Sequence, residues 1–280
     1  MALSRTQVNI FNEKGYLIVP DVFGNDELSK MKVRIKEYLD GCREYDERWL
    51  TMEPGASDVS GESPRQADRI RKLCMITLVD PLFHKMATHS KFIEVLQGCL
   101  GNNVCAWASN IFLKQATHGE RQPWHRDTNH YQPPSATIWT PLMDSTVKNG
   151  CMWAAPGTHL INVGDGLTSE YNLEQERKFH AGEFEHEIVP LEMKAGDSLI
   201  WDTRMLHSSE SNSSEASRWA FTLHCSTTEA VIERKKIRPD AGPHELIAGR
   251  LDDQTARQVF CMHRQPHAFA DFVLPEDTYK

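Results

Sequence analysis

The sequence predicts a mainly β protein, a sandwich or jelly roll with helices placed before it. From Val104 onward the chain consists of short β-type runs separated by turn residues, without a helical period between them. Such a series is typical of a sandwich or jelly roll and differs from the strand–helix alternation of a doubly wound sheet. The predicted strands cover residues 104–114, 137–144, 151–155, 187–193, 198–202 and 218–225.

Helices are predicted ahead of the first of these strands. Residues 7–13 and 26–39 carry apolar side chains at helical spacing. Residues 90–100 form a third such segment, and the glycine after it, Gly101, stands where a helix C-cap is expected. Between the first two helices the apolar run 16–19 predicts a short strand. These elements should flank the β region.

We expect a single domain, because a large β domain with helical additions commonly reaches 280 residues. The helical part would cover about 1–103, the β core about 104–228, and a C-terminal extension 229–280, with a last helix over 252–264. The stretch 53–68 is polar and rich in Gly, Ser and Pro, which predicts a long loop of the kind that often serves as a lid.

Composition excludes several classes of function. Apolar residues make up 40% and charged residues 25%, as in soluble globular proteins rather than disordered or fibrous ones. A net charge of -8 without a Lys/Arg cluster argues against nucleic acid as a partner. No apolar run is long enough for a membrane span, and the first residues do not form a signal peptide. We therefore expect a cytoplasmic monomer or homodimer.

Cysteine usage agrees with a reducing compartment. The seven cysteines are scattered, odd in number and contain no C-x-x-C pair. Neither a zinc knuckle nor a disulfide framework is predicted from such spacing. Buried, reduced thiols are the expected state.

Two segments carry candidate metal ligands. His125 and Asp127 stand two apart, so on a strand both side chains leave the same face and can share one ion. His207 follows an apolar strand at its polar end and can complete the site. Two imidazoles and one carboxylate suit non-haem iron(II), whereas zinc remains open on the ligands alone, although the helical zinc motif H-E-x-x-H is absent.

Arg218 begins the strand after the polar loop 208–217. We expect a hairpin to bring it back beside His207. A buried arginine requires an anionic partner, and a carboxylate ligand would supply one. The guanidinium can grip such a carboxylate through two parallel hydrogen bonds, and Ser209, on the same strand face as His207, can add a hydroxyl.

These segments together resemble the phytanoyl-CoA dioxygenase family of iron(II)- and 2-oxoglutarate-dependent oxygenases. The resemblance spans roughly residues 8–226. Its parts are Gly15-Tyr16-Leu17-Ile18-Val19-Pro20, Trp124-His125-Arg126-Asp127, Asn149-Gly150-Cys151 leading to Pro156-Gly157-Thr158-His159, and His207 followed by Arg218.

The resemblance implies a double-stranded β-helix of the jelly-roll, cupin-like type. It implies iron(II) on His125, Asp127 and His207, with 2-oxoglutarate held at its distal carboxylate by Arg218 and Ser209, and dioxygen as the oxidant. By the same resemblance the positions that contact the co-substrate are Lys72, Asn110, Trp139 and Thr158. Arg71 is an alternative to Lys72, and Thr158 with His159 is better suited to a structural turn, with the co-substrate contact of Thr158 as the alternative.

The implied activity is hydroxylation of an unactivated C–H bond of a small molecule, for example a natural-product intermediate, with release of succinate and carbon dioxide. Desaturation, cyclisation or epimerisation by the same oxidative chemistry remains open, as do a metal-dependent hydrolase and a non-catalytic jelly-roll binding protein. The fatty acyl-CoA substrate is not carried over, because the segment after Asp127 is shorter than in the phytanoyl-CoA enzymes. Five other histidines are candidate donors to the substrate: His118, His130, His180, His186 and His224.

Overall fold

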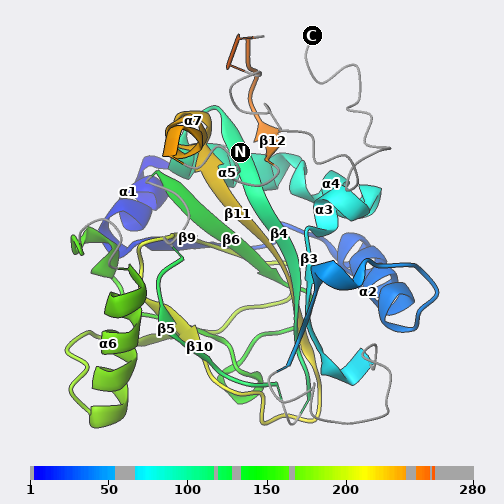
Figure 1. Cartoon of the computed structure of the whole chain (residues 1–280), viewed down its shortest axis with the longest axis horizontal. Coiled ribbons are helices and arrows are strands. Elements are labelled where there is room, and N and C mark those ends of the chain that lie inside the picture. The colour runs from blue at the N-terminus through cyan, green and yellow to red at the C-terminus, as the bar shows by residue number, and fades with distance from the viewer. Residues whose placement is uncertain are drawn as a thin grey trace.

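Two antiparallel sheets face each other and form a double-stranded β-helix (Figure 1). The structure is a computed structural model that describes residues 3–53, 67–116, 119–127, 134–163, 168–237, 244–252 and 254–255. The major sheet runs in the order β1 (Tyr16–Val19), β9 (Ser198–Asp202), β6 (Ser135–Pro141), β11 (Arg218–Thr227), β4 (Val104–Lys114), β3 (Ile70–Cys74) and β2 (Leu50–Met52), with β12 (Glu245–Ala248) paired to β4. The minor sheet runs in the order β5 (Gln122–His125), β10 (His207–Ser209), β7 (Met152–Ala154) and β8 (Val189–Leu191).

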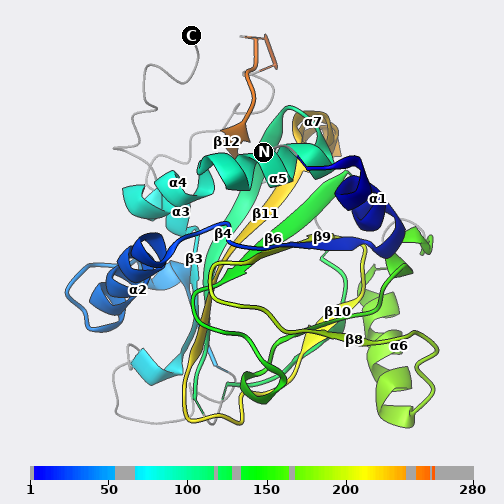
Figure 2. The same cartoon turned by 180° about the vertical axis from the view of Figure 1, so that it is seen from behind.

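The larger core lies between the major sheet and helices on its outer face (Figure 2). Alternation along β11 explains this placement: Phe221 and Leu223 point outward, and the Phe221 ring stacks on Phe92 of α5 at 6.0 Å between centroids. These helices are α1 (Arg5–Lys14), α2 (Asn25–Leu39), α3 (Ile76–Val79), α4 (Pro81–Ala87) and α5 (Ser90–Leu100). The opposite face of β11 is thereby left for the space between the sheets.

Two further helices lie beside the sheets. Helix α6 (Thr168–Ala181) packs on the minor sheet, and α7 (Thr228–Ile237) continues from β11 (Figure 1). Short 3₁₀ helices complete the described elements: η1 (Glu47–Trp49), η3 (Ala67–Arg69), η4 (Val147–Asn149) and η5 (Thr158–Leu160). Among the described residues no helix is long and apolar enough to cross a membrane.

Most predicted elements are present, with differences at their ends. The strand predicted over 137–144 begins at Ser135 and stops at Pro141. Helices α3, α4, α6 and α7 and strands β2, β3 and β12 were not predicted, and β12 shows that part of the extension after residue 228 pairs with the core. Most of the predicted loop 53–68 and of the predicted helix 252–264 lies outside the described residues.

Candidate active site

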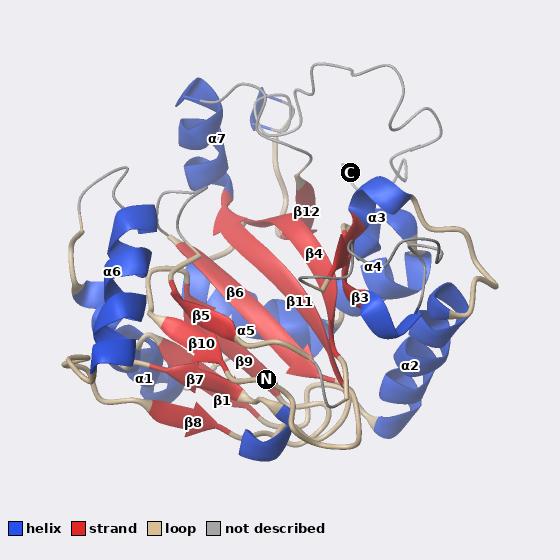
Figure 3. Ribbon diagram, turned by 60° about the horizontal axis from the view of Figure 1, so that its bottom comes forward, coloured by secondary structure: helices blue, strands red, loops and turns tan. Residues whose placement is uncertain are grey.

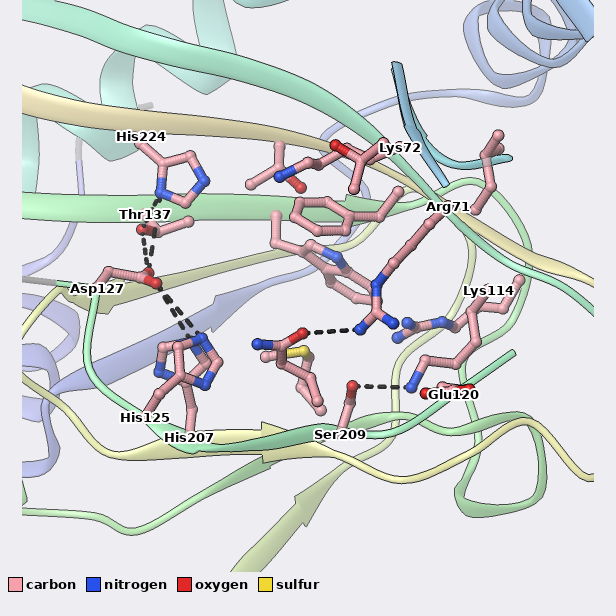
Figure 4. A pocket seen from close by; sticks show the side chains of 18 of the residues that line it. Arg71, Lys72, Lys114, Glu120, His125, Asp127, Thr137, His207, Ser209 and His224 are labelled. Carbon is pink, nitrogen blue, oxygen red and sulfur yellow. Dashed lines mark hydrogen bonds and ion pairs between the residues drawn. The ribbon is translucent and has the colours of Figure 1, made fainter. Parts of the chain in front are cut away.

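Three side chains converge at one end of the space between the sheets (Figure 4). Strand pairing sets His207 of β10 directly opposite His125 of β5, with ring centroids 4.2 Å apart. Asp127 lies just past the end of β5, where its backbone N–H donates to the Thr203 carbonyl at 2.8 Å. Its Oδ1 is 3.6 Å from His125 Nε2 and 3.7 Å from His207 Nε2, close enough for one ion to contact all three atoms.

The two imidazoles are oriented by backbone carbonyls. His125 Nδ1 is 2.7 Å from the Pro123 oxygen, and His207 Nδ1 is 3.0 Å from the Met205 oxygen. A carbonyl oxygen can only accept, so each Nδ1 must carry the proton and each Nε2 presents its lone pair to the site. Burial also lowers the pKa of His207 to about 4, which keeps this ring neutral. Both rings are therefore preset as metal ligands.

The carboxylate of Asp127 is fixed through its other oxygen. Thr137 Oγ1 donates to Oδ2 at 2.8 Å and Trp201 Nε1 donates to it at 3.2 Å, which leaves Oδ1 for a metal. Burial alone would raise the pKa of Asp127, but His207, His224 and His125 and the Thr137 hydrogen bond outweigh it and lower the pKa to about 2. An ionised carboxylate beside two imidazoles fits iron(II).

A second group of side chains occupies the other end of the same cavity. Arg218 is 3% exposed, and its guanidinium lies 5.1 Å from the Trp139 ring. Its Nε and Nη1 have no hydrogen-bond partner among the described residues. Burial lowers the pKa of Arg218 to about 10, yet the side chain stays charged at neutral pH. A buried cation with unused donors is costly unless an anion joins it.

Lys114 lies beside Arg218, because the two residues are paired across β4 and β11. Its Nζ donates to Ser209 Oγ at 2.9 Å and to the Glu210 carbonyl. Burial is the main cause that lowers the pKa of Lys114 to about 6, and the charges of Arg218 and Arg71 add to it. The Arg218 cation, the Lys114 amine and one hydroxyl thus meet across the gap between the sheets, an arrangement complementary to a carboxylate, which would also favour protonation of Lys114.

One cavity of about 370 Å³ joins the two ends. It contains most of the residues that the sequence singled out. Its lining includes His125, Asp127, His207, Ser209, Arg218, Lys72 and Trp139.

The predicted hairpin between His207 and Arg218 is wrong. Strand β10 pairs with β5 and β7 in the minor sheet, whereas β11 pairs with β4 and β6 in the major sheet. The connecting loop crosses from one sheet to the other, so Arg218 faces Ser209 across the cavity rather than beside it. The two residues still share one cavity, although for a different geometric reason.

Two predicted residues are placed outside the cavity lining. Thr158 Oγ1 donates to the Ala155 carbonyl at 2.7 Å and accepts from the Leu206 N–H at 2.9 Å, so its hydroxyl serves a turn, the other role foreseen for it. Asn110 lies on the cavity face of β4, opposite Thr222, but does not belong to the described lining. We therefore do not include either residue among the proposed co-substrate contacts.

Lys72 and Arg71 both reach the cavity, from opposite faces of β3. The Lys72 ammonium lies 5.3 Å from the Phe112 ring centroid. Arg71 is already engaged: it donates to Glu53 Oε2 at 3.0 Å and to Gln122 Oε1 at 2.8 Å, and so bridges β3 and the minor sheet (Figure 4). Of the two, Lys72 is the cation without a carboxylate partner among the described residues.

Several residues of the site were not predicted from the sequence. Lys114 follows Asn110 by four positions on one strand, and period-2 alternation alone could have placed it on the same face. Nothing local in the sequence marks Thr137 or Trp201 as partners of Asp127. Of the five candidate histidines, only His224 lines the cavity, with its Nδ1 3.0 Å from Thr137 Oγ1, while His118 and His130 lie outside the described residues.

The fold and the site define a class of protein. A His–Asp–His set that leaves one side of the metal open, inside a double-stranded β-helix, is the arrangement of non-haem iron(II) oxygenases. The anion-binding end of the cavity adds room for an oxo-acid co-substrate.

Comparison with known proteins gives the family. The family model for phytanoyl-CoA dioxygenase (PhyH) matches residues 11–220, and the chain therefore belongs to this family of iron(II)- and 2-oxoglutarate-dependent oxygenases. The phytanoyl-CoA dioxygenase 1 of Oryza sativa subsp. japonica is 26% identical over 262 residues, which cover 81% of this chain and 90% of that protein.

Solved structures show the same fold. The structure of EctD from S. alaskensis with 2-oxoglutarate and 5-hydroxyectoine has a TM-score of 0.65 at 20% identity and covers 81% of this chain and 77% of that one. The carbocyclase SnoK from nogalamycin biosynthesis, dependent on non-haem iron and alpha-ketoglutarate, also has a TM-score of 0.65, at 19% identity, with 81% and 85% of the two chains covered.

Proposed function

We propose that this oxygenase hydroxylates an unactivated C–H bond of a small organic molecule. The substrate and 2-oxoglutarate would each receive one atom of dioxygen, giving an alcohol, succinate and carbon dioxide. One observation carries the proposal: a preset His–Asp–His set and two buried basic side chains, Arg218 and Lys114, face the same cavity. A co-substrate with one carboxylate at the metal and one at a distance matches both ends.

The metal ligands and Arg218 would bind opposite ends of the co-substrate. His125, Asp127 and His207 would hold iron(II), which with 2-oxoglutarate and dioxygen supplies an oxidant able to remove hydrogen from carbon. Arg218 would grip the distal carboxylate with its unused Nε and Nη donors.

The remaining contacts support that grip. Lys114, beside Arg218, and Ser209, on the other side of the cavity, would donate to the same carboxylate in place of the bond that now joins them to each other. The Arg218 guanidinium lies over the Trp139 ring, and this cation–π contact would help to hold it in place. Lys72 would act further out, near the side of the cavity lined by Glu53 and Arg71.

The same oxidative chemistry can give products other than an alcohol. Solved structures of the same fold include a carbocyclase and an epimerase as well as EctD, so cyclisation or epimerisation by the same chemistry is the second candidate. Which outcome occurs depends on where the substrate places its carbon relative to the metal, because the protein contributes chiefly position and exclusion of water.

The test is a screen for substrate-stimulated succinate release. Protein loaded with iron(II) and 2-oxoglutarate is offered small carboxylates, acyl thioesters, terpenoids and alkaloids, with Asp127→Ala as the matched inactive control. We expect one compound class to raise succinate formation in the wild type and to leave the variant unchanged. Product formation with zinc and without 2-oxoglutarate would instead identify a hydrolase.

A further inference from the structure

Strand β5, which carries His125, runs along the outer edge of the minor sheet. Its inner neighbour is β10, and on its other side no strand is present among the described residues. A strand edge normally leaves its N–H and C=O groups to solvent or to another chain. Here helix α6 lies along that edge (Figure 3). The backbone that supports two of the three metal ligands therefore depends on a helix for its outer hydrogen bonds.

The side chain of Asn172 on α6 replaces the missing strand. The Arg126 N–H donates to Asn172 Oδ1 at 3.0 Å, and Asn172 Nδ2 donates to the Arg126 carbonyl at 3.3 Å. The amide thus makes both hydrogen bonds that a neighbouring strand would make to that residue. Arg126 is the residue between His125 and Asp127.

Glu176 extends the same contact by one helical turn. Positions i and i+4 lie on one face of a helix, so Glu176 and Asn172 reach the strand together. Glu176 Oε2 accepts the Trp124 N–H at 2.9 Å, and its Oε1 accepts from the Arg121 guanidinium. The two side chains together hold the outer edge of residues 124–126.

The Arg126 side chain anchors the segment from a third direction. It is 2% exposed and donates to the carbonyls of Ile161 and Thr158. Its guanidinium lies 4.5 Å from the Tyr171 ring, on the same helix as Asn172. Because φ and ψ are the only soft torsions of the backbone, fixing residue 126 on its edge and through its side chain limits the directions of both neighbouring side chains.

We propose that Asn172, supported by Glu176, is a positioning residue for the metal centre. It would hold the backbone of Arg126 so that His125 Nε2 and Asp127 Oδ1 keep the separation of 3.6 Å that suits a shared ion. The inference rests on the proposed function, because it presupposes that these ligands bind iron(II). Partners that orient metal ligands typically contribute about ten- to hundredfold to metal affinity.

The test measures metal binding and ligand geometry rather than turnover. Co(II), which reports its ligand geometry through visible absorption, is titrated into the full chain of the wild type, Asn172→Ala and Asn172→Asp. Asn172→Ala should weaken Co(II) binding by roughly ten- to hundredfold and alter the absorption bands. Asn172→Asp should lose less, because it still accepts the Arg126 N–H. The control is Glu174→Gln, on the same helix in an exposed pair with Arg177, which should bind as the wild type does.

Two results would overturn the proposal, and they differ. Unchanged Co(II) affinity and absorption in Asn172→Ala, together with a lower melting temperature, would show that Asn172 only attaches the helix. Unchanged Co(II) affinity in His125→Ala would show that His125 is not a metal ligand. The proposed metal centre and the positioning role of Asn172 would then both be rejected. Weakened binding in His125→Ala alone would therefore reject the role of Asn172 while leaving the proposed function intact.

Discussion

The two ends of the cavity are built on opposite principles. At the metal end each of the three ligands has a fixed partner: carbonyls orient His125 and His207, and Thr137 and Trp201 hold Asp127. At the other end Arg218 keeps two buried nitrogens without partners among the described residues. The pKa of Lys114 is lowered to about 6, chiefly by burial. One end is arranged before any ligand arrives, and the other is completed by its ligand.

The two ends should contribute separately to the binding of the metal and of the co-substrate. A preset ligand set loses little order on binding a cation. At the other end, the buried Arg218 charge gains a partner and Lys114 can hold its proton only when an anion joins them. Substitutions at the metal end should therefore remove binding of the ion, while substitutions at the cationic end should selectively weaken the co-substrate.

The largest effect is expected from the metal ligands. His125→Ala, Asp127→Ala and His207→Ala each remove one ligand from a set of three, so turnover should be abolished and iron binding weakened. Metal content after dialysis and succinate formation are the measurements. A variant that keeps full activity would remove that residue from the site.

Arg218→Leu should come next and should affect the co-substrate alone. Losing a buried charge-assisted contact costs about 2–5 kcal/mol, so binding of 2-oxoglutarate should weaken by roughly thirty- to several-thousand-fold. The same variant without ligands should melt at a higher temperature, because an unpaired buried cation is gone. The control is Arg177→Leu, at an exposed position on α6. Equal loss of affinity for the metal would contradict the division between the ends.

Lys114→Met should have an intermediate effect that depends on pH. Losing a hydrogen bond to a charged group costs about 1.5–3 kcal/mol, so 2-oxoglutarate should bind roughly ten- to hundredfold more weakly. In the wild type the pKa of Lys114 is about 6 without ligand, and a bound carboxylate should raise it. Above pH 6 binding should then take up a proton, and affinity should fall as pH rises.

Calorimetry of 2-oxoglutarate binding in buffers of different ionisation enthalpy measures that proton uptake. The uptake should be present in the wild type and absent in Lys114→Met. Stability of the empty protein has the opposite pH dependence. The pKa of Lys114 in the fold is below its ordinary value, so the unfolded chain binds more protons between pH 6 and 10.5 and stability should rise with pH there. A buffer-independent heat in the wild type would mean that Lys114 is already charged.

Lys72→Met should give the smallest change. Lys72 is half-buried, and a partly exposed charge contributes about 0.2–1 kcal/mol, or a change of up to roughly fivefold in the apparent KM for 2-oxoglutarate. Steady-state kinetics with Lys85→Met, an exposed lysine of α4, as control would detect it. A loss as large as that of Arg218→Leu would place the distal carboxylate at Lys72 instead.

The sequence predicted those parts of the site that local spacing determines. His125 and Asp127 are two residues apart, and the strands over 104–114 and 198–202 have the predicted bounds. Arg218 was expected to need an anion because of its charge and its place at the start of an apolar strand. Each of these inferences uses only residues close to one another in the chain.

The rest depends on pairing between distant segments. The sequence could not show that β10 and β11 belong to different sheets, and so the hairpin was wrong. Helix α6 was not predicted, and its polar contacts with β5, made by Asn172 and Glu176, carry no apolar period that could have indicated them. The low pKa of Lys114 arises from burial between two sheets, which no local pattern reports.

The division between the two ends is tested most directly by one set of anaerobic titrations. Mn(II) and then 2-oxoglutarate are titrated into the wild type, His207→Ala and Arg218→Leu, and both dissociation constants are measured for each protein. Arg218→Leu should bind Mn(II) as the wild type does and lose 2-oxoglutarate, whereas His207→Ala should lose Mn(II). Undiminished binding of 2-oxoglutarate to Mn(II)-loaded Arg218→Leu would contradict the assignment of the cationic end and bring the co-substrate itself into question.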